Sequence, residues 1–295
     1  MRVLLTGATG FIGRNLLAQL ANNHEVIAVT RYPSDLGVEQ VVADLAESDF
    51  YRSLPDGVDA IVHLAQSRGR RQFPEEAPDI YNVNVGSSFR LADWARRTGV
   101  GKFVFASTAN VYAASSEILS EESATLADSF YGSTKLAAEH LVSQFGGHFE
   151  VDILRLFTVY GPQQRDSLIP QIIEKIDRGE DINLRGENGF LLSPIYVGDV
   201  SHSVSQILDS PLTLSSRVFN LGGGESTNLR DLSRTISELM DIPCGFKIEG
   251  HSTRSFAGNS SRFDQTFQPG EQTAITDGLR RTLEYFYEEK RERVE

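Results

Sequence analysis

The sequence of 295 residues has one cysteine, two methionines and one tryptophan. A single cysteine, Cys244, excludes an internal disulfide and a CxxC motif. The six histidines are scattered and none has HExxH spacing, so we expect no metal site. No apolar run approaches the roughly 20 residues that span a bilayer, and the N-terminus shows no signal-peptide pattern. We therefore expect a cytoplasmic protein without membrane contact.

Positive charge is also scarce. The 28 lysines and arginines are outnumbered by 40 aspartates and glutamates, which gives a formal net charge of −12. Such a field repels a phosphate backbone, so nucleic acid is not an expected partner. A local basic pocket for a small phosphate ligand is still compatible with this charge.

The first half of the chain alternates short apolar runs with helical patterns. Apolar runs occupy residues 3–5, 26–29, 40–42, 60–64, 103–105 and 151–156, and helical patterns occupy 13–20, 80–97 and 129–145. Repeated strand–helix–strand units predict an α/β fold with a doubly wound parallel sheet. Beyond Gly161 helical patterns at 169–177, 199–208 and 229–239 dominate, separated by loops. We predict a smaller C-terminal substrate lobe over 162–295, with 194–221 packing back onto the first domain.

A glycine-rich loop, Thr6 to Gly13, follows the first predicted strand and opens the first helix. Gly7 permits a sharp turn, Gly10 lets the backbone approach a pyrophosphate, and Gly13 lets helix and strand pack closely. The helix N-terminus then offers N–H groups to the anion. In this context the loop predicts a Rossmann-type dinucleotide-binding domain over residues 1–161, rather than a structural turn.

The residues after the second strand bear on which dinucleotide is bound. An acidic residue there accepts from the ribose 2′-hydroxyl of NAD, but this chain has Thr30-Arg31. Arg31 can pair with a 2′-phosphate, or it is an ordinary exposed loop residue. This position favours NADP over NAD and leaves both open.

A candidate reaction centre lies near the start of the helix at 129–145. Tyr131 and Lys135 are four residues apart and share a helix face. A nearby ammonium lowers the pKa of a phenol, so we expect the pair to act as a proton donor and acceptor for a carbonyl–alcohol interconversion. Thr108 ends a buried strand, where chemistry occurs in such sheets, and can hydrogen-bond a substrate oxygen.

These residues belong to a wider pattern. The chain resembles the extended short-chain dehydrogenases/reductases, specifically the NAD-dependent epimerase/dehydratase family that acts on nucleotide sugars. The matching motifs are TGATGFIG at 6–13, ADL at 43–45, VHLA at 62–65, Asn84, STANVY at 107–112, YGSTK at 131–135, LRLFTVYGP at 154–162, PIYVGDV at 194–200 and FNLGG at 219–223.

The resemblance implies roles for individual residues. Tyr131 is the expected acid/base, Lys135 binds the nicotinamide ribose, Thr108 holds the reacting oxygen and Asn84 supports this geometry. The expected cofactor-binding residues are Gly7, Thr9, Gly10, Phe11, Ile12, Gly13, Arg31, Asp44, Leu45, Leu64, Ala65, Tyr131 and Lys135. A homodimer built through the helices around Arg90 and Tyr131 is also implied.

The chain departs from the family pattern near the substrate. Family dehydratases have acidic residues after the catalytic threonine, whereas Ala109 and Asn110 stand here, so dehydratase chemistry is disfavoured. Ser193-Pro194 replaces a frequent Arg-Asp pair that binds substrate phosphate. Arg68, Arg70 and Arg71 form a basic loop that either binds an anionic substrate or is solvated. The expected substrate residues are Thr108, Asn110, Thr158, Arg185 and Arg254.

The sequence thus predicts an NAD(P)-dependent enzyme that acts on a secondary alcohol or ketone of a small molecule. A nucleotide-sugar epimerase or 4-keto reductase is the first hypothesis. The alternatives are a ketoreductase on a non-nucleotide substrate and a non-catalytic dinucleotide sensor. An intact Thr108, Tyr131 and Lys135 argues against the sensor.

Overall fold

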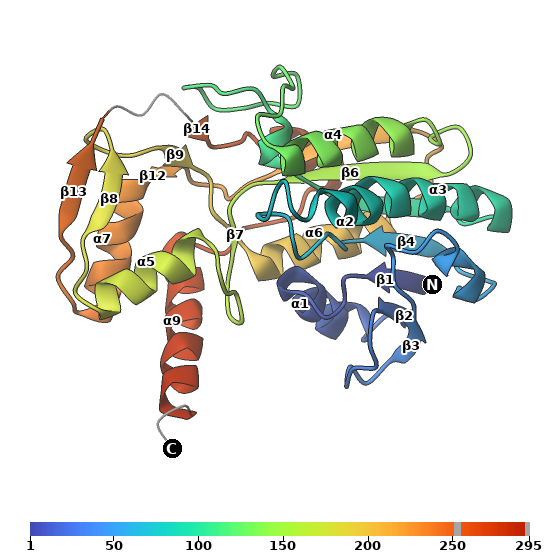
Figure 1. Cartoon of the computed structure of the whole chain (residues 1–295), viewed down its shortest axis with the longest axis horizontal. Coiled ribbons are helices and arrows are strands. Elements are labelled where there is room, and N and C mark those ends of the chain that lie inside the picture. The colour runs from blue at the N-terminus through green and yellow to red at the C-terminus, as the bar shows by residue number, and fades with distance from the viewer. Residues whose placement is uncertain (251–254, 293–295) are drawn as a thin grey trace.

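A computed structural model describes residues 1–250 and 255–292, and its centre is one seven-stranded parallel sheet (Figure 1). The strand order is β11-β6-β5-β4-β1-β2-β3, so the chain changes direction on either side of β1. The strands are β1 (Arg2–Thr6), β2 (Glu25–Thr30), β3 (Glu39–Val42), β4 (Ala60–His63), β5 (Lys102–Thr108), β6 (Glu150–Leu156) and β11 (Ser216–Leu221). The predicted doubly wound α/β fold is confirmed.

Helices cover both faces of the sheet, because alternate strand side chains point to opposite sides. Phe103 and Phe105 of β5 pack with α3 (Ser87–Thr98) and α4 (Phe130–Ser143). Val104, between them, belongs to the opposite core layer, with α1 (Phe11–Leu20) and α6 (Val197–Asp209). Both layers are apolar, which explains why the strands read as continuous hydrophobic runs.

Part of the second half of the chain returns to the sheet. β11 pairs in parallel with β6 and forms the edge of the sheet, with Val218 beside Ile153 and Asn220 beside Arg155. α6 lies against α1, and α8 (Ser261–Phe267) contributes Phe263 to the same core layer. The sheet is therefore completed by residues that follow the first domain in sequence.

The helix expected at 80–97 is present, as part of a longer helical segment that contains a π-helical turn. The chain forms α2 (Ala77–Tyr81), a π-helical turn (Asn82–Gly86) and then α3. Asn84 is fully buried in the π-helical turn, and its side-chain amide bonds to two other segments. A π-helical turn adds a residue to one helical turn, and apolar spacing alone cannot reveal it.

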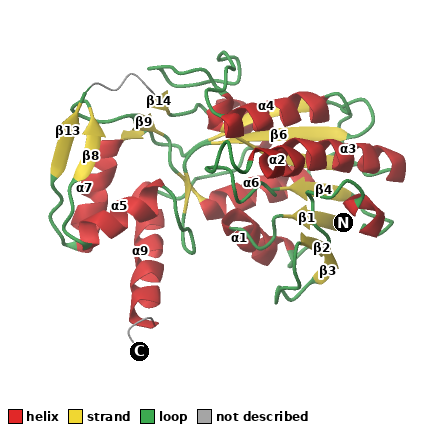
Figure 2. Cartoon of the chain, in the orientation of Figure 1, coloured by secondary structure: helices red, strands yellow, loops and turns green. Residues whose placement is uncertain are grey.

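The second half of the chain contains short strands where only loops were expected. Figure 2 labels β8, β9, β13 and β14 among them. The strands pair as β7 with β10, β8 with β13, and β9 with both β12 and β14. The strands are β7 (Val159–Tyr160), β8 (Ile182–Arg185), β9 (Leu191–Leu192), β10 (Ile195–Tyr196), β12 (Thr227–Asn228), β13 (Phe246–Glu249) and β14 (Ser255–Phe256). Runs of two to four residues are too short to show a strand period.

Three helices complete the second lobe. α5 (Leu168–Asp177), α7 (Leu229–Met240) and α9 (Ile275–Glu292) share an apolar core, and α9 extends from the lobe in Figure 1. Two short 3₁₀ turns, Phe50–Ser53 and Ala109–Val111, lie in the first domain. Within residues 1–250 and 255–292, no helix has the length and apolarity that a membrane crossing requires.

The close contact between α1 and the glycine loop gives a stability prediction. A Cβ on Gly13 would lie 2.1 Å from the Gly7 carbonyl oxygen and 2.8 Å from Ala8 Cα, both backbone atoms. We expect Gly13→Ala to lower the free energy of unfolding by about 1–3 kcal/mol in urea denaturation. Gly147→Ala is the matched control, since nothing lies within 4 Å of its added Cβ. Equal stability of the two variants would contradict the close-packing argument.

Candidate active site

A cavity of about 680 Å³ opens where the strands of the main sheet end. It is bounded by the segments that follow β1, β2, β4 and β5 and by the first turns of α4. Every residue expected to bind the dinucleotide lines it: Gly7, Thr9, Gly10, Phe11, Ile12, Gly13, Arg31, Asp44, Leu45, Leu64, Ala65, Tyr131 and Lys135. Thr108 lines it as well, so the folded chain brings the two predicted groups of residues together.

The glycine loop has the shape that a diphosphate requires. Gly7 has a φ of +74°, and a Cβ there would lie 2.8 Å from the Ala65 backbone nitrogen. Gly10 caps the N-terminus of α1, and no side chain caps that end of the helix. The N–H groups and the positive end of the helix dipole are therefore available to an anion in the cavity. These features fit a bound dinucleotide.

The far end of the cavity carries one ion pair. Arg31 Nε lies 3.4 Å from an Asp44 carboxylate oxygen, and the two side chains are 36% and 37% exposed. The other Asp44 oxygen accepts a hydrogen bond from the Ala46 backbone nitrogen at 3.0 Å. Asp44 thus holds the Arg31 guanidinium beside the end of β2, where the ribose of a dinucleotide is expected.

Tyr131 and Thr108 face each other at the reacting end. Ser129 accepts a hydrogen bond from the Gly132 nitrogen, which begins α4 and places Tyr131 in its first turn. The Tyr131 hydroxyl donates to Gln66 Oε1 at 2.8 Å. Thr108 Oγ1 accepts from the backbone nitrogen of Asn110 at 3.3 Å and from its side-chain amide at 3.0 Å.

The expected lowering of the Tyr131 pKa by Lys135 is wrong. Burial raises the pKa of Tyr131, and the opposing effects come from the Arg70 guanidinium and from a hydrogen bond with Thr108. Burial also lowers the pKa of the Lys135 ammonium, to about 7. A lysine that is only partly charged at neutral pH stabilises a phenolate weakly.

Lys135 is one of the largest fully buried side chains of the protein. It is 1% exposed, and its Nζ lies 4.2 Å from the centre of the Phe105 ring. Glu139, one helical turn further along α4, raises the pKa of Lys135 against the larger effect of burial. The charge at this position is therefore set by two opposing physical effects.

Glu139 is a functional candidate that the sequence reasoning missed. Its carboxylate accepts two hydrogen bonds from Arg155 Nε at 3.2 Å and one from Arg155 Nη2 at 2.8 Å. It also accepts a hydrogen bond from the Ser107 hydroxyl. Glu139 is four residues beyond Lys135 on the same helix face, and that spacing is the signal that could have identified it.

Asn84 connects the loop after β4 to α4. Its side-chain oxygen accepts from the Ser67 nitrogen at 3.0 Å, and its side-chain nitrogen donates to Thr134 Oγ1 at 3.0 Å. Thr134 in turn donates to the Tyr131 carbonyl oxygen at 2.8 Å. Gln66, also missed, lies in the same loop, and its place directly after β4 was the available signal. Asn84 therefore fixes Tyr131 relative to this loop.

The remaining substrate candidates do not line the cavity, although Asn110 contacts Thr108 and Thr158 lies between two lining residues, Phe157 and Val159. Asn110 and Thr158 are partly buried, but neither lines it. Arg185 is exposed at the end of β8 and interacts electrostatically with Glu249 of β13. Arg254 lies outside the described residues. Arg68, Arg70 and Arg165 are the arginines that line the reacting side of the cavity, and Arg71 does not line it.

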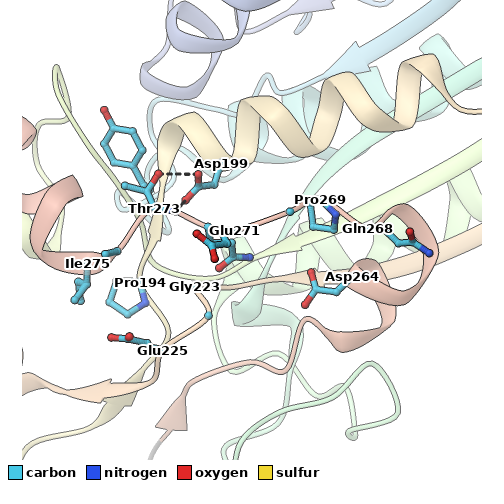
Figure 3. A pocket seen from close by; sticks show the side chains of 15 residues that line it. Pro194, Asp199, Gly223, Glu225, Asp264, Gln268, Pro269, Glu271, Thr273 and Ile275 are labelled. Atoms are coloured by element: carbon cyan, nitrogen blue, oxygen red, sulfur yellow. Dashed lines mark hydrogen bonds between the residues drawn. The ribbon is translucent and has the colours of Figure 1, made fainter.

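Two further hollows lie in the second half of the chain. One, of about 720 Å³, is bordered by the start of α6 and by the segment 268–275, and Figure 3 shows Asp199, Glu225, Asp264 and Glu271 around it. Asp199 there accepts hydrogen bonds from Thr273. Four carboxylates make this hollow unsuitable for a diphosphate.

The second hollow, about 410 Å³, lies between α5 and α9. Gln163, Gln164, Arg165 and Asp166 line both this hollow and the dinucleotide cavity. Gln163 and Asp166 have φ values of 68° and 52°, in the left-handed region that most side chains avoid. Arg165 forms an ion pair with Glu289 of α9.

Known proteins match this chain over most of its length. A family model described as the NAD dependent epimerase/dehydratase family matches residues 3–222. An uncharacterized UDP-glucose epimerase of Bacillus subtilis, YtcB, is 28% identical over 97% of this chain and 98% of its own. A dTDP-4-dehydro-6-deoxy-D-allose reductase of a Streptomyces species is 28% identical over 84% of this chain and 83% of its own. A solved structure of MoeE5 with UDP-glucuronic acid and NAD has 29% sequence identity and a TM-score of 0.87. The match covers 98% of this chain and 100% of the MoeE5 chain.

The buried Lys135 ammonium gives a pH-dependent stability prediction. Its native pKa of about 7 lies below the roughly 10.4 of an unfolded lysine, so the unfolded chain binds more protons between these values. The buried charge of Lys135 destabilises the folded state in full below pH 7. This destabilisation decreases as the pH rises towards 10, because the folded protein loses the Lys135 proton first. The free energy of unfolding of the wild type, minus that of Lys135→Met, should therefore increase from pH 7 to 10 in urea titrations.

A second variant tests the cause of this dependence. Glu139→Gln removes the carboxylate that raises the Lys135 pKa, so the rise in relative stability should begin at a lower pH. A wild-type minus Lys135→Met difference that stays constant from pH 6 to 10 would contradict the assignment.

Proposed function

The chain belongs to the NAD dependent epimerase/dehydratase family, and we propose that it is an NAD(P)-dependent nucleotide-sugar enzyme, either an epimerase or a 4-keto reductase. The observation that carries the proposal is the common cavity that joins the glycine loop to Thr108, Tyr131 and Lys135. The relatives support it, since they are named as UDP-glucose epimerases and a dTDP-sugar reductase, and MoeE5 was solved with UDP-glucuronic acid and NAD.

The residues that would hold NAD follow from the cavity. The α1 N-terminus and the Gly7–Gly10 backbone suit the diphosphate, Asp44 and Leu45 border the adenine end, and Lys135 lies where the nicotinamide ribose is expected. When bound, NAD supplies the acceptor or donor of a hydride. The protein contributes orientation and control of one proton.

That proton belongs to the substrate oxygen. Thr108 Oγ1 accepts two hydrogen bonds from Asn110, so its own hydrogen points to Tyr131 and can be donated to a substrate oxygen that binds beside Tyr131. Tyr131 takes the proton from an alcohol as a phenolate during oxidation, and as a phenol it gives a proton to the carbonyl oxygen during reduction. The Tyr131 hydroxyl now donates its hydrogen bond to the side-chain oxygen of Gln66. A bound substrate oxygen can take the place of Gln66 as the acceptor.

The same geometry opposes elimination of water. Ala109 is buried and has no titratable group, and the Asn110 amide is engaged with Thr108. Asp44 and Asp166 are the only carboxylates among the described lining residues, and neither neighbours Thr108 in sequence. We therefore propose epimerase or reductase chemistry in preference to dehydration.

We also propose a two-fold homodimer through α3 and α4. These two helices pack against each other, and each carries an exposed apolar side chain, Phe89 at 47% and Leu141 at 39%. Phe89 also packs near Phe145, directly after α4. An exposed apolar surface of this kind is suited to burial against a second copy.

Tyr131→Phe tests the enzymatic proposal. Removing the hydroxyl should lower kcat by about 10²–10⁴-fold, because no other group at this position transfers the proton, while NAD binding persists. Turnover is measured with UDP-glucose, UDP-glucuronic acid and a dTDP-4-keto sugar, and NAD binding by fluorescence titration. Tyr81→Phe, at a tyrosine that is 55% exposed, is the matched control. Full activity of Tyr131→Phe would end the acid/base assignment.

Arg31 supports a finer proposal, that the site accepts NADP and prefers it to NAD. The guanidinium is held at the end of β2 and can pair with a 2′-phosphate. We expect Arg31→Ala to weaken NADPH binding roughly tenfold and NADH binding much less. Arg52→Ala, at an arginine whose side chain is 73% exposed, is the control. NADH binding to the wild type as tightly as NADPH would refute the preference.

A further inference from the structure

The loop after β4 contains three arginines in four residues, and two of them face the active cavity. Arg68 and Arg70 line the cavity together with Tyr131 and Thr108, whereas Arg71 is exposed outside it. A positive loop at the reacting end stands out in a chain with a net charge of −12. No ligand group has so far been assigned to the positive charge of Arg68 and Arg70.

The loop is held in place by several contacts. Ser67 is fully buried, accepts from the Gly69 nitrogen at 3.1 Å, and donates its hydroxyl to the Asp79 carboxylate. Asn84 holds the backbone nitrogen of Ser67, as described above. Further along, the Phe73 ring stacks on Phe130 at 4.6 Å, next to Tyr131. Arg70 therefore emerges from a turn with a defined position.

Arg70 has no counter-charge of its own. It is partly buried, and no carboxylate among the described residues lies within 4.0 Å of its guanidinium. Its positive field reaches Tyr131, where it lowers the phenol pKa against the larger effect of burial. Partial burial of an unpaired cation is unfavourable, so a bound anion would stabilise this arrangement.

The position of Arg70 indicates which anionic group of a substrate it would bind, a diphosphate or a carboxylate on the sugar. The dinucleotide diphosphate is accounted for by the α1 N-terminus, whereas Arg70 lines the cavity together with Tyr131 and Thr108, at its reacting end. In a hexose that reacts at C4, the C5 substituent is adjacent to the reacting oxygen, and the diphosphate is attached across the ring at C1. Of the two anions, a C6 carboxylate is therefore the nearer to Tyr131.

We propose that Arg70 binds a carboxylate on the reacting sugar, so that the preferred substrate is a nucleoside diphosphate uronic acid. This inference rests on the proposed nucleotide-sugar function and narrows its substrate class. A guanidinium matches a carboxylate with two parallel hydrogen bonds, which a hydroxymethyl group at the same carbon cannot reproduce. Arg70 is thus a specificity-determining residue.

The test compares two ligands that differ at C6 alone. UDP-glucuronic acid and UDP-glucose are titrated calorimetrically into NAD-loaded protein that carries Tyr131→Phe, which prevents turnover. Arg70→Gln, Arg70→Lys and Arg71→Gln are compared in this background, with thermal unfolding to show that each is folded. Arg71→Gln is the matched control, since it removes the same charge from an adjacent exposed position.

We expect the parent protein to bind UDP-glucuronic acid roughly tenfold or more tightly than UDP-glucose. Arg70→Gln should remove this difference by weakening UDP-glucuronic acid alone, Arg70→Lys should restore part of it, and Arg71→Gln should leave it unchanged. Equal weakening of both ligands by Arg70→Gln would mean that Arg70 binds a shared part of the substrate. That result, or no preference in the parent protein, overturns the inference and leaves the proposed function standing. Binding of NAD but of neither UDP-sugar overturns both.

Discussion

The buried charge at Lys135 is the constraint on which the active site depends. An ammonium that is 1% exposed needs a compensating carboxylate, and Glu139 supplies it from the next turn of α4. Glu139 is fixed in turn by Arg155 of β6 and Ser107 of β5, so the helix is held to two strands by charge-assisted hydrogen bonds. Because Tyr131 lies in the first turn of the same helix, the contacts that fix Glu139 beside Lys135 also determine where the phenol lies.

The distribution of charge explains how an acidic protein can accept a diphosphate. Arg31, Arg68, Arg70 and Arg165 all line the dinucleotide cavity, and they are combined there with the positive end of α1. Four carboxylates instead surround the hollow of Figure 3. Net charge therefore says little about ligand preference, and the local arrangement of side chains decides it.

The parts predicted well from sequence depend on local signals. The glycine loop, the strand ends and the Tyr131–Lys135 spacing are each set within about eight residues, and the parallel sheet brings them together at one edge. The parts missed depend on distant partners. The π-helical turn is stabilised by Asn84 contacts with Ser67 and Thr134, and the raised pKa of Tyr131 follows from burial by several segments. The strands of the second lobe were too short to show any period.

The segment 163–166 forms a wall between two spaces. Its one side faces the dinucleotide cavity, and its other side faces the groove between α5 and α9, where Arg165 meets Glu289. Two of its residues already have left-handed backbone conformations, so the segment has little freedom to change locally without strain. The shapes of the two spaces are consequently linked. Because residues 163–166 line both spaces, a displacement of this segment would change both shapes at once, through residues outside the glycine loop.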